Sequence, residues 1–249
     1  MKVRIDKLLV DRSLAPSRER AQAMILAGRV LVNEQKVTKS GATIEDTAEI
    51  RLLGDDNPYV SRGGLKLERA LEHWKIDLSG KACMDVGAST GGFTDCMLQH
   101  GAASVLAVDT GYGQIDVKLR NDSRVTLLEK TNARYLEAAQ VERPIQFVAM
   151  DVSFISATLV LPAVINAALR NKGGELVLLV KPQFEVGREL IGKGGIVRDE
   201  TAQMAAAEKV KESVASLGGT NIEVIDSPIL GTEGNREFLL HASFPGSAQ

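Results

Sequence analysis

The chain has 249 residues, of which 44% are hydrophobic and 25% are charged, which is the composition of a folded globular protein. This length exceeds one small core and favours one large domain with a small appendage. No apolar run approaches the roughly 20 residues that a membrane-spanning helix needs, and the polar first residues are unlike a secretory signal, so we expect a cytoplasmic protein without stable membrane insertion.

Charge is distributed unevenly along the chain, although the formal net charge is only −2. Residues 1–40 contain nine lysines and arginines against four acidic residues, a net charge of +5, which leaves −7 for the remainder. Because lysine and arginine supply much of the affinity of proteins for RNA phosphates, this basic segment is a candidate RNA-binding module. A solvated helix face would carry the same charge, so charge alone leaves both interpretations open.

The first predicted elements are two short helices and a hairpin. Apolar residues recur at helical spacing, Ser17 is placed to cap the second helix, and Gly28 is placed to end it. The hairpin follows from two extended pieces that flank a two-residue turn. The helices span residues 4–10 and 17–27, and the hairpin strands span residues 30–32 and 35–37.

The domain boundary is predicted from turn chemistry. A strand-like run at residues 48–53 is followed by residues 55–59, which combine acids with asparagine and proline. We therefore expect a small domain and linker over residues 1–58 and a larger domain over residues 59–249.

The first domain resembles a known RNA-binding module, the S4 domain. The resemblance rests on Arg4-Ile5-Asp6-Lys7-Leu8-Leu9, Ser17-Arg18, Ala21, Gly28-Arg29-Val30 and Val32-Asn33. It implies a small α+β domain whose helical pair presents basic side chains to structured RNA, which proteins recognise largely through backbone and shape. The candidates for these phosphate contacts are Arg4, Lys7, Arg18, Arg20 and Arg29. Surface ion pairs of Arg4 and Arg18 with nearby acids such as Asp6 are the alternative interpretation.

Beyond Gly80 the chain alternates apolar runs with helical stretches, the pattern of a mainly parallel sheet covered on both faces. The predicted strands span residues 82–86, 105–109, 125–129, 147–151, 175–181, 221–227 and 237–244. The predicted helices include residues 94–100, 157–170 and 201–217. Seven strands fit the sheet of a Rossmann-like methyltransferase, so we predict an α/β fold after the small N-terminal domain.

A glycine-rich turn follows the first of these strands, at the carboxyl edge where doubly wound sheets bind ligands. Its glycines do not have the G-x-G-x-x-G spacing of a dinucleotide-binding turn. The turn is similar to the cofactor loop of S-adenosylmethionine-dependent methyltransferases, and Asp109 at the end of the second strand is placed to accept hydrogen bonds from a ribose. A generic α/β turn is the alternative. The candidate cofactor-binding residues are Asp85, Gly87, Ser89, Thr90, Gly91, Gly92, Phe93, Asp109, Asn132 and Asp151.

The resemblance extends over nearly the whole chain and is to the TlyA family. Besides the S4-like start, it rests on residues 61–67 (SRGGLKL), 85–93 (DVGASTGGF), 151–156 (DVSFIS), 180–185 (VKPQFE), 194–199 (GGIVRD) and 235–238 (NREF). The family is often labelled hemolysin, but its body resembles the FtsJ-type ribose 2'-O-methyltransferases. The resemblance therefore implies methyl transfer from S-adenosylmethionine to a cytidine ribose of ribosomal RNA or ribosomal subunits, with adenine-side contacts near Asn132. The Lys-Asp-Lys-Glu tetrad of those enzymes matches Lys66, Asp151, Lys181 and Glu237.

These residue types suit the reaction because a ribose hydroxyl is a poor nucleophile that must be oriented and deprotonated. Lys181 ends a buried strand, where desolvation and a neighbouring cation such as Lys66 favour a neutral amine, so it is the candidate base. Asp151 and Glu237 favour charged amines, and we expect them chiefly to orient the two lysines. The ordinary alternatives are an exposed Lys66 and a Glu237 that merely begins a strand.

Three other functions are open: a membrane-active hemolysin, an RNA-binding ribosome assembly factor with an inactive methyltransferase body, and a pseudouridine synthase. The first is disfavoured by the lack of a membrane-spanning run, and the second by the complete tetrad and cofactor loop. The third is disfavoured by the cofactor loop before a Rossmann-like body. No cluster of residues has metal-ligand spacing, so we expect no metal. Cys83 and Cys96 are expected to be reduced packing residues.

Overall fold

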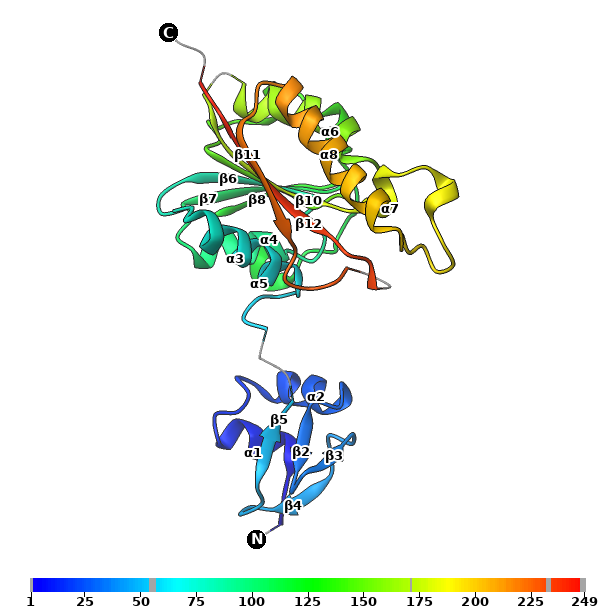
Figure 1. The fold of residues 1–249 in the computed structure, drawn as a ribbon. Helices are drawn as coiled ribbons and strands as arrows, with labels where there is room; N and C mark the ends of the chain where they lie inside the picture. The colour runs from blue at the N-terminus through cyan, green and yellow to red at the C-terminus, as the bar shows by residue number, and fades with distance from the viewer. Residues whose placement is uncertain (1, 54–56, 171, 232–233, 247–249) are drawn as a thin grey trace. The chain divides into compact units, whose positions relative to one another are not determined.

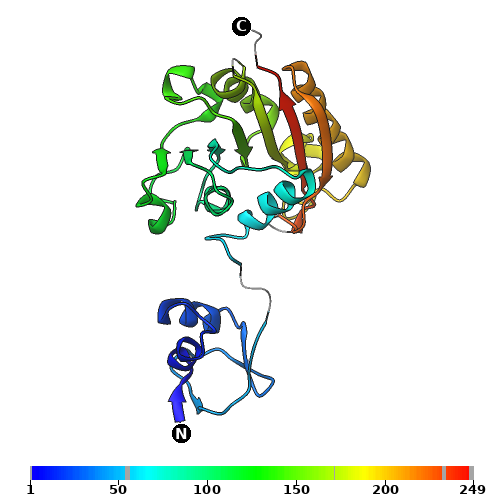
Figure 2. The ribbon, with the colours of Figure 1, turned by 90° about the vertical axis from the view of Figure 1, so that its left-hand side faces the viewer.

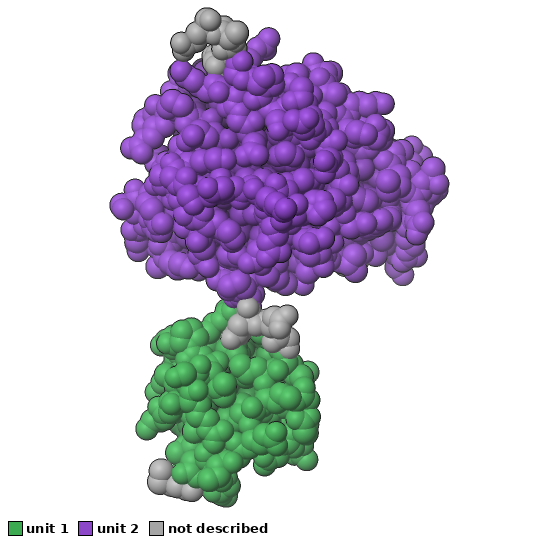
Figure 3. All heavy atoms as spheres, turned by 60° about the vertical axis from the view of Figure 1, so that its left-hand side comes forward, with its two compact units in different colours: residues 1–56 green, residues 57–249 purple. Residues whose placement is uncertain are grey.

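The computed structural model describes residues 2–53, 57–170, 172–231 and 234–246. The chain forms two compact units, Met1–Asp56 and Asn57–Gln249, which are green and purple in Figure 3. Each unit contains a hydrophobic core of its own. Asp55 and Asp56, which begin the turn-rich segment at the predicted domain boundary, lie outside the described residues.

The first unit is a small α+β domain built from two helices and short strands. Its helices are α1 (Ile5–Asp11) and α2 (Arg18–Leu26). Its strands are β1 (Lys2–Arg4), β2 (Val30–Val32), β3 (Gln35–Val37), β4 (Thr43–Glu45) and β5 (Ile50–Leu52). Strand β2 pairs antiparallel with β3 and β5, which confirms the predicted hairpin. The hydroxyl of Ser17 accepts a hydrogen bond from the backbone N–H of Arg20 at 3.2 Å and caps α2 as predicted.

The start of the first helix differs from the prediction. The sequence predicts a helix from Arg4, but α1 begins at Ile5, because Arg4 is paired with Thr43 in an antiparallel ladder of β1 and β4. Strands of three residues carry too little alternation to be recognised from sequence, so this ladder was not predicted.

A buried carboxylate connects the two helices of the first unit. Asp6 is 0% exposed and accepts hydrogen bonds from Arg4 at 3.0 and 2.8 Å, from Arg18 at 3.0 Å and from Gln22 at 2.9 Å. These hydrogen bonds hold the pKa of Asp6 well below its usual range, although burial acts in the opposite direction. The bond from Arg4 has the largest effect. The ion pairs considered as an alternative for Arg4 and Arg18 are therefore formed, yet about half of each arginine side chain stays exposed.

The second unit is organised around a mixed sheet that has seven strands in the described residues, in the order β11-β12-β10-β9-β6-β7-β8 (Figure 1). The strands are β6 (Ala82–Val86), β7 (Ser104–Val108), β8 (Val125–Leu128), β9 (Phe147–Met150), β10 (Gly174–Val180), β11 (Thr220–Asp226) and β12 (Phe238–Phe244). Strands β6 to β10 run parallel, whereas β12 is antiparallel to both of its neighbours. Each predicted strand matches an observed one to within one residue at either end.

Helices cover both faces of this sheet. They are α3 (Gly63–Trp74), α4 (Gly92–Gln99), α5 (Val117–Arg120), α6 (Ala157–Val164), α7 (Pro182–Glu185) and α8 (Glu200–Ser216). Helix α6 continues as a π-helical turn over Ile165–Leu169, so the predicted helix over residues 157–170 is present but changes its pitch near Pro162. Short 3₁₀ turns are Ala133–Tyr135, Ala138–Gln140 and Arg188–Leu190.

Successive side chains of a buried strand point to opposite faces of the sheet, so the hydrophobic core is divided between the two faces. Met84 and Val148 belong to the core packed against α6 and α8, whereas Phe147 and Cys83 belong to the core packed against α3, α4 and α5. In Figure 2 the cyan helix α3 and the orange helix α8 lie on opposite sides of the red strand β12. Both cysteines are buried in the second of these cores, as expected of packing residues. Because helices and core side chains fill both faces of the sheet, the ends of its strands are the place left for a ligand site.

We expect Asp6→Asn to loosen the first unit and to reduce its sensitivity to acid. Because the folded pKa of Asp6 is lowered, its carboxylate adds stability above the usual aspartate pKa of about 4, and this contribution is lost as the pH falls through the folded value. Hydrogen exchange of α1 and α2 in the full chain, corrected for intrinsic exchange rates, should show lower protection at neutral pH in the variant. The loss of protection on acidification should also be shallower than in the wild type.

Asp11→Asn, which changes an exposed carboxylate on the same helix, is the matched control and should behave like the wild type. Equal protection of α1 and α2 in the wild type and Asp6→Asn would contradict a stabilising role for the buried carboxylate.

Candidate active site

The candidate residues converge on one edge of the large sheet. A glycine-rich loop follows β6, Asp109 follows β7, Asp151 follows β9 and Lys181 follows β10. Because β12 is antiparallel and pairs Phe238 with Val180, Glu237 just before β12 reaches the same edge. The topology therefore assembles side chains from distant segments at the carboxyl ends of the parallel strands.

The loop after β6 approaches its neighbours too closely for any residue but glycine at two positions. Gly87 has φ +86°, and a Cβ there would lie 2.3 Å from the backbone oxygen of Asp151. Gly91 has φ +95°, and a Cβ there would lie 2.2 Å from a methyl carbon of Leu119. Helix α4 begins directly after this loop at Gly92. The glycines thus let the loop pass between two strand ends and leave open space beside them.

Two cavities meet at this loop. The first, of about 310 Å³, is called the lysine cavity because Lys66 and Lys181 line it. The second, of about 370 Å³, is called the aspartate cavity because Asp109 lines it. Both are lined by Gly87, Ser89, Asp151 and Ser153, so they adjoin along the loop and the end of β9.

Most of the candidate cofactor residues line one of these cavities. The lysine cavity includes Thr90, Gly92 and Phe93, and the aspartate cavity includes Asp109 and Asn132. The two carboxylate oxygens of Asp109 accept backbone N–H groups of Ser89 at 2.7 Å and Gly111 at 2.6 Å. The side chain of Asn132 accepts the backbone N–H of Arg134 at 3.0 Å. Each of these oxygens has a second lone pair with which it can accept a hydrogen bond from a ligand.

Asp85 and Gly91 differ from the other candidates. Within the described residues, neither lines the lysine cavity or the aspartate cavity. Asp85 is 0% exposed and accepts a hydrogen bond from the hydroxyl of Thr94 at 2.6 Å. Burial raises the pKa of Asp85 to about 7, and Thr94 opposes this rise. Asp85 therefore supports the loop from behind, between β6 and α4.

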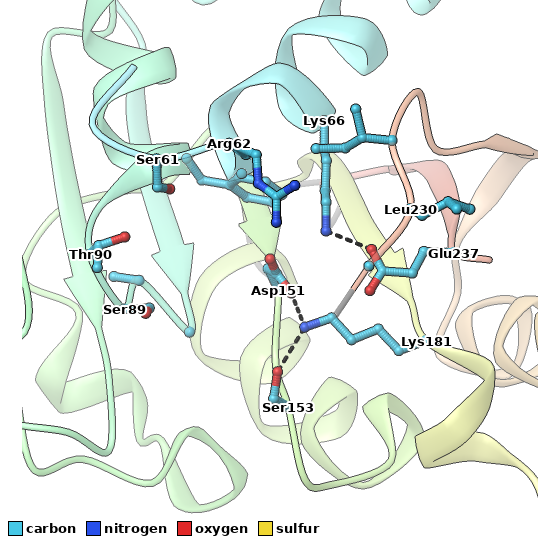
Figure 4. Close-up of a pocket in the computed structure, with 17 residues that line it drawn as sticks. Ser61, Arg62, Lys66, Ser89, Thr90, Asp151, Ser153, Lys181, Leu230 and Glu237 are labelled. Atoms are coloured by element: carbon cyan, nitrogen blue, oxygen red, sulfur yellow. Dashed lines mark hydrogen bonds and ion pairs between the residues drawn. The ribbon is translucent and has the colours of Figure 1, made fainter. Parts of the chain in front are cut away.

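The four tetrad residues lie together in the lysine cavity as two ion pairs (Figure 4). Lys66 Nζ lies 2.5 Å from Glu237 Oε2, and Lys181 Nζ lies 2.5 Å from Asp151 Oδ1. The Lys181 amine also donates to the hydroxyl of Ser153 at 2.7 Å. Lys66 is only 8% exposed, so its interpretation as an ordinary surface lysine is wrong. Each amine thus contacts a carboxylate that another element of the fold supplies.

A third cavity, of about 750 Å³, opens beside the tetrad and contains residues that the sequence analysis did not single out. Lys181 and Glu237 line it together with Phe154 and Phe184, whose ring centroids are 5.5 Å apart. Phe154 is 93% exposed and has φ +65°, a conformation that is costly for a bulky side chain. The signal in the sequence was an aromatic residue three positions after each of Asp151 and Lys181.

The candidate RNA contacts all lie in the first unit. Arg4 and Arg18 are held by Asp6, whereas Lys7 and Arg20 are exposed on α1 and α2. Arg29 is half-buried and donates from its Nε to the backbone oxygen of Leu53 at 3.1 Å. The first unit thus presents several basic groups, and two of them, Arg4 on β1 and Arg18 on α2, are held by Asp6.

The sheet order, its antiparallel β12, the glycine loop after β6 and the acid after β7 define an α/β methyltransferase fold. The sequence model of the FtsJ-like methyltransferase family matches residues 59–244, and that of the S4 domain matches residues 3–50. The chain belongs to the FtsJ-like methyltransferase family and carries an S4 domain before the catalytic unit.

Similar proteins support the resemblance to the TlyA family. The chain is 45% identical over 249 residues to the putative rRNA methyltransferase YqxC of Bacillus subtilis, covering 100% of this chain and 88% of that protein. It is 42% identical over 240 residues to the 16S/23S rRNA (cytidine-2'-O)-methyltransferase TlyA of Mycobacterium tuberculosis, covering 96% of this chain and 89% of that protein. A solved structure of a putative hemolysin from Streptococcus thermophilus matches with a TM-score of 0.76 and 43% identity, covering 100% of this chain and 90% of that chain.

No helix among the described residues is long and apolar enough to cross a membrane. No group of three or more histidine, cysteine or acidic side chains among them could hold a metal ion.

We expect Gly87→Ala to destabilise the second unit by about 2 kcal/mol or more, because a positive φ is strained for alanine and its Cβ would collide with the backbone of Asp151. Gly80→Ala is the matched control: Gly80 has φ +72°, but nothing lies within 4 Å of its Cβ position. Urea unfolding followed by the fluorescence of Trp74 would measure both variants. The difference between them reports the collision, and equal losses of stability would show that the close approach to Asp151 is unimportant.

Proposed function

We propose that the chain transfers the methyl group of S-adenosylmethionine to a ribose 2'-hydroxyl of cytidine in ribosomal RNA. The observation that carries the proposal is the pair of lysine–carboxylate contacts, Lys66 with Glu237 and Lys181 with Asp151, in a cavity that adjoins the glycine loop. Cytidine and ribosomal RNA are supported by the printed activity of the Mycobacterium tuberculosis relative. Such a substrate is consistent with a reaction in the cytoplasm.

The residues around the aspartate cavity fit S-adenosylmethionine. The glycine loop, whose Gly87 lines both cavities, would admit the amino-acid end, while Asp109 would accept ribose hydroxyls and Asn132 would face the adenine side. When bound, the cofactor supplies an activated methyl group on a sulfonium. Methyl transfer to a hydroxyl forms one C–O bond, breaks one C–S bond and releases one proton, which the protein must accept.

Lys181, in its neutral amine form, is the proposed acceptor of that proton, and it becomes the ammonium that pairs with Asp151. Its amine is held from two sides, by Asp151 and by the hydroxyl of Ser153, so it has a fixed position in the cavity. Lys66 and Glu237 line the same cavity as a second pair and are proposed to orient the hydroxyl. Orientation and proton removal are what this reaction requires of the chain, since the methyl group is already activated.

The S4 domain is the proposed RNA anchor. We assign RNA binding to residues 1–58 and catalysis to residues 59–249. Arg4, Lys7, Arg18, Arg20 and Arg29 are the proposed phosphate contacts. Contacts to phosphates contribute affinity without reading sequence, so the choice of target nucleotide falls to the catalytic unit.

We expect Lys181→Met to lower the rate of methyl transfer by roughly 100-fold or more, because a positioned base contributes about this much. Labelled methyl from S-adenosylmethionine would be followed into unmodified ribosomal subunits, and the product mapped for 2'-O-methylcytidine. Lys211→Met, which removes an exposed lysine of α8 paired with Glu208, is the control and should keep the wild-type rate.

Cofactor binding, measured by calorimetry, should be nearly the same in the wild type and Lys181→Met. A variant that retains most of its rate would rule out Lys181 as the base. Cofactor binding by the wild type without incorporation into any subunit would instead favour an assembly factor.

Removal of one proposed phosphate contact should weaken RNA binding in a salt-dependent manner. We expect Arg18→Gln to lower affinity for ribosomal RNA and to reduce the slope of log affinity against log salt by about one. Arg51→Gln is the matched control, because Arg51 is an arginine of the same unit that also pairs with an acid, Glu34 at 2.5 and 2.8 Å, but lies on β5 and not among the proposed contacts. Titration of labelled RNA at several salt concentrations measures both slopes, and the same slope in all three proteins would refute the contact.

A further inference from the structure

A buried carboxylate outside the tetrad lies at the end of α7. Glu185 is 7% exposed and closes the motif that begins with Lys181. Its Oε2 accepts a hydrogen bond from the hydroxyl of Ser156 at 2.5 Å, and its Oε1 accepts the backbone N–H of Ala157 at 2.6 Å. Nothing in the proton transfer described above uses this group, although burying a carboxylate is costly unless the group is well bonded.

Glu185 and Lys181 hold two points of one segment. Lys181 binds Asp151 and Ser153 at the start of residues 151–157, and Glu185 binds Ser156 and Ala157 at its end. Both anchors belong to one element, because Lys181 is the N-cap residue of the short helix α7 and Glu185 is its last residue. Residues of the held segment line the lysine cavity, the aspartate cavity and the third cavity.

The residue between the anchors needs external support. Phe154 has a left-handed backbone with φ +65° and is 93% exposed, so burial of its side chain does little to hold this conformation. Strained backbone persists only where the surroundings determine it. Lys181 on one side and Glu185 on the other supply fixed hydrogen bonds at both ends of the strained stretch.

The charge of Glu185 is itself compensated. Lys209 on α8 lies 3.4 Å from Glu185 Oε2 and also donates to the backbone oxygen of Glu185 at 2.8 Å. The carboxylate further accepts the N–H of Ala157 in the first turn of α6, where a helix N-terminus favours negative charge. These contacts connect α6, α7 and α8 at one point behind the site.

We propose that Glu185 is a positioning residue for the methyl transfer, acting through Ser156 and Ala157 on the segment that carries Asp151 and Ser153. This inference rests on the proposed function. Glu185 holds the far end of the segment, and Lys181 can bind Asp151 and Ser153 in one geometry only while that end is fixed. Loss of the anchor should therefore affect the chemical step more than the binding of cofactor, because small misplacements of reacting groups are costly.

The test compares Glu185→Ala, Glu185→Gln and the control Glu208→Ala, which alters an exposed acid of α8. We expect Glu185→Ala to lower the single-turnover rate of methyl transfer by roughly tenfold or more, while the Kd for S-adenosylmethionine changes by less than about threefold. Glu185→Gln keeps an acceptor for Ala157 and should recover to within about threefold of the wild type. Hydrogen exchange of residues 151–157 should accelerate in Glu185→Ala and remain normal in the other two proteins.

Ser156→Ala removes one of the two bonds and serves if Glu185→Ala does not fold; it should change the rate in the same direction by a smaller factor. Unchanged exchange of residues 151–157 in these variants, or faster exchange with an unchanged single-turnover rate, would overturn the inference. An equal loss of activity in Glu185→Gln and Glu185→Ala would also overturn it. A wild-type protein that methylates no ribose refutes the proposed function, and the exchange data then still decide whether Glu185 anchors the segment.

Discussion

The ion pair of Lys181 with Asp151 joins the ends of two adjacent parallel strands, and much of the catalytic unit serves to keep that pair in place. Strands β9 and β10 run side by side in register, so the residues that follow them must emerge together at the carboxyl edge. The antiparallel β12 then brings Glu237 to the same edge from the opposite chain direction. One constraint of topology thus assembles a site from residues as far apart as Asp151 and Glu237, which are 86 positions apart in the sequence.

Sequence patterning made the larger unit predictable, since its central strands β6, β9, β10 and β12 are largely buried on both faces and helical stretches separate most of the strands. The tetrad could also be predicted from the sequence. Asp151 and Lys181 are ionisable residues at strand ends, and Lys66 and Glu237 match a known motif. The ladder of β1 and β4 could not be predicted, because strands of three residues have no clear period. The positive φ of Phe154 and the burial of Asp85 depend on tertiary contacts that leave no local pattern.

Two of the basic side chains in the first unit are held in place by an acidic residue, which the sequence alone does not indicate. Asp6 neutralises part of the positive charge, yet it binds Arg4 through two nitrogens and Arg18 through one, which fixes both guanidinium groups. Fixing a side chain before it meets its ligand lowers the conformational entropy lost on binding. A count of charges therefore understates the role of an acidic residue, because the acid determines where the arginines point.

The carboxyl groups of the catalytic unit have different partners, and their surroundings differ accordingly. Asp151 and Glu237 face lysine amines, and Glu185 has Lys209, Ser156 and a helix N-terminus. Asp85 faces the hydroxyl of Thr94 in a buried position, and burial raises its pKa to about 7. Between the ordinary aspartate pKa of about 4 and the raised pKa of about 7, the folded state thus retains a proton that the unfolded state releases, so ionising Asp85 opposes folding. A carboxyl group in this unit therefore pairs with a lysine amine, bonds to a serine and a helix N-terminus, or lies buried behind the glycine loop, and its hydrogen-bond partners differ accordingly.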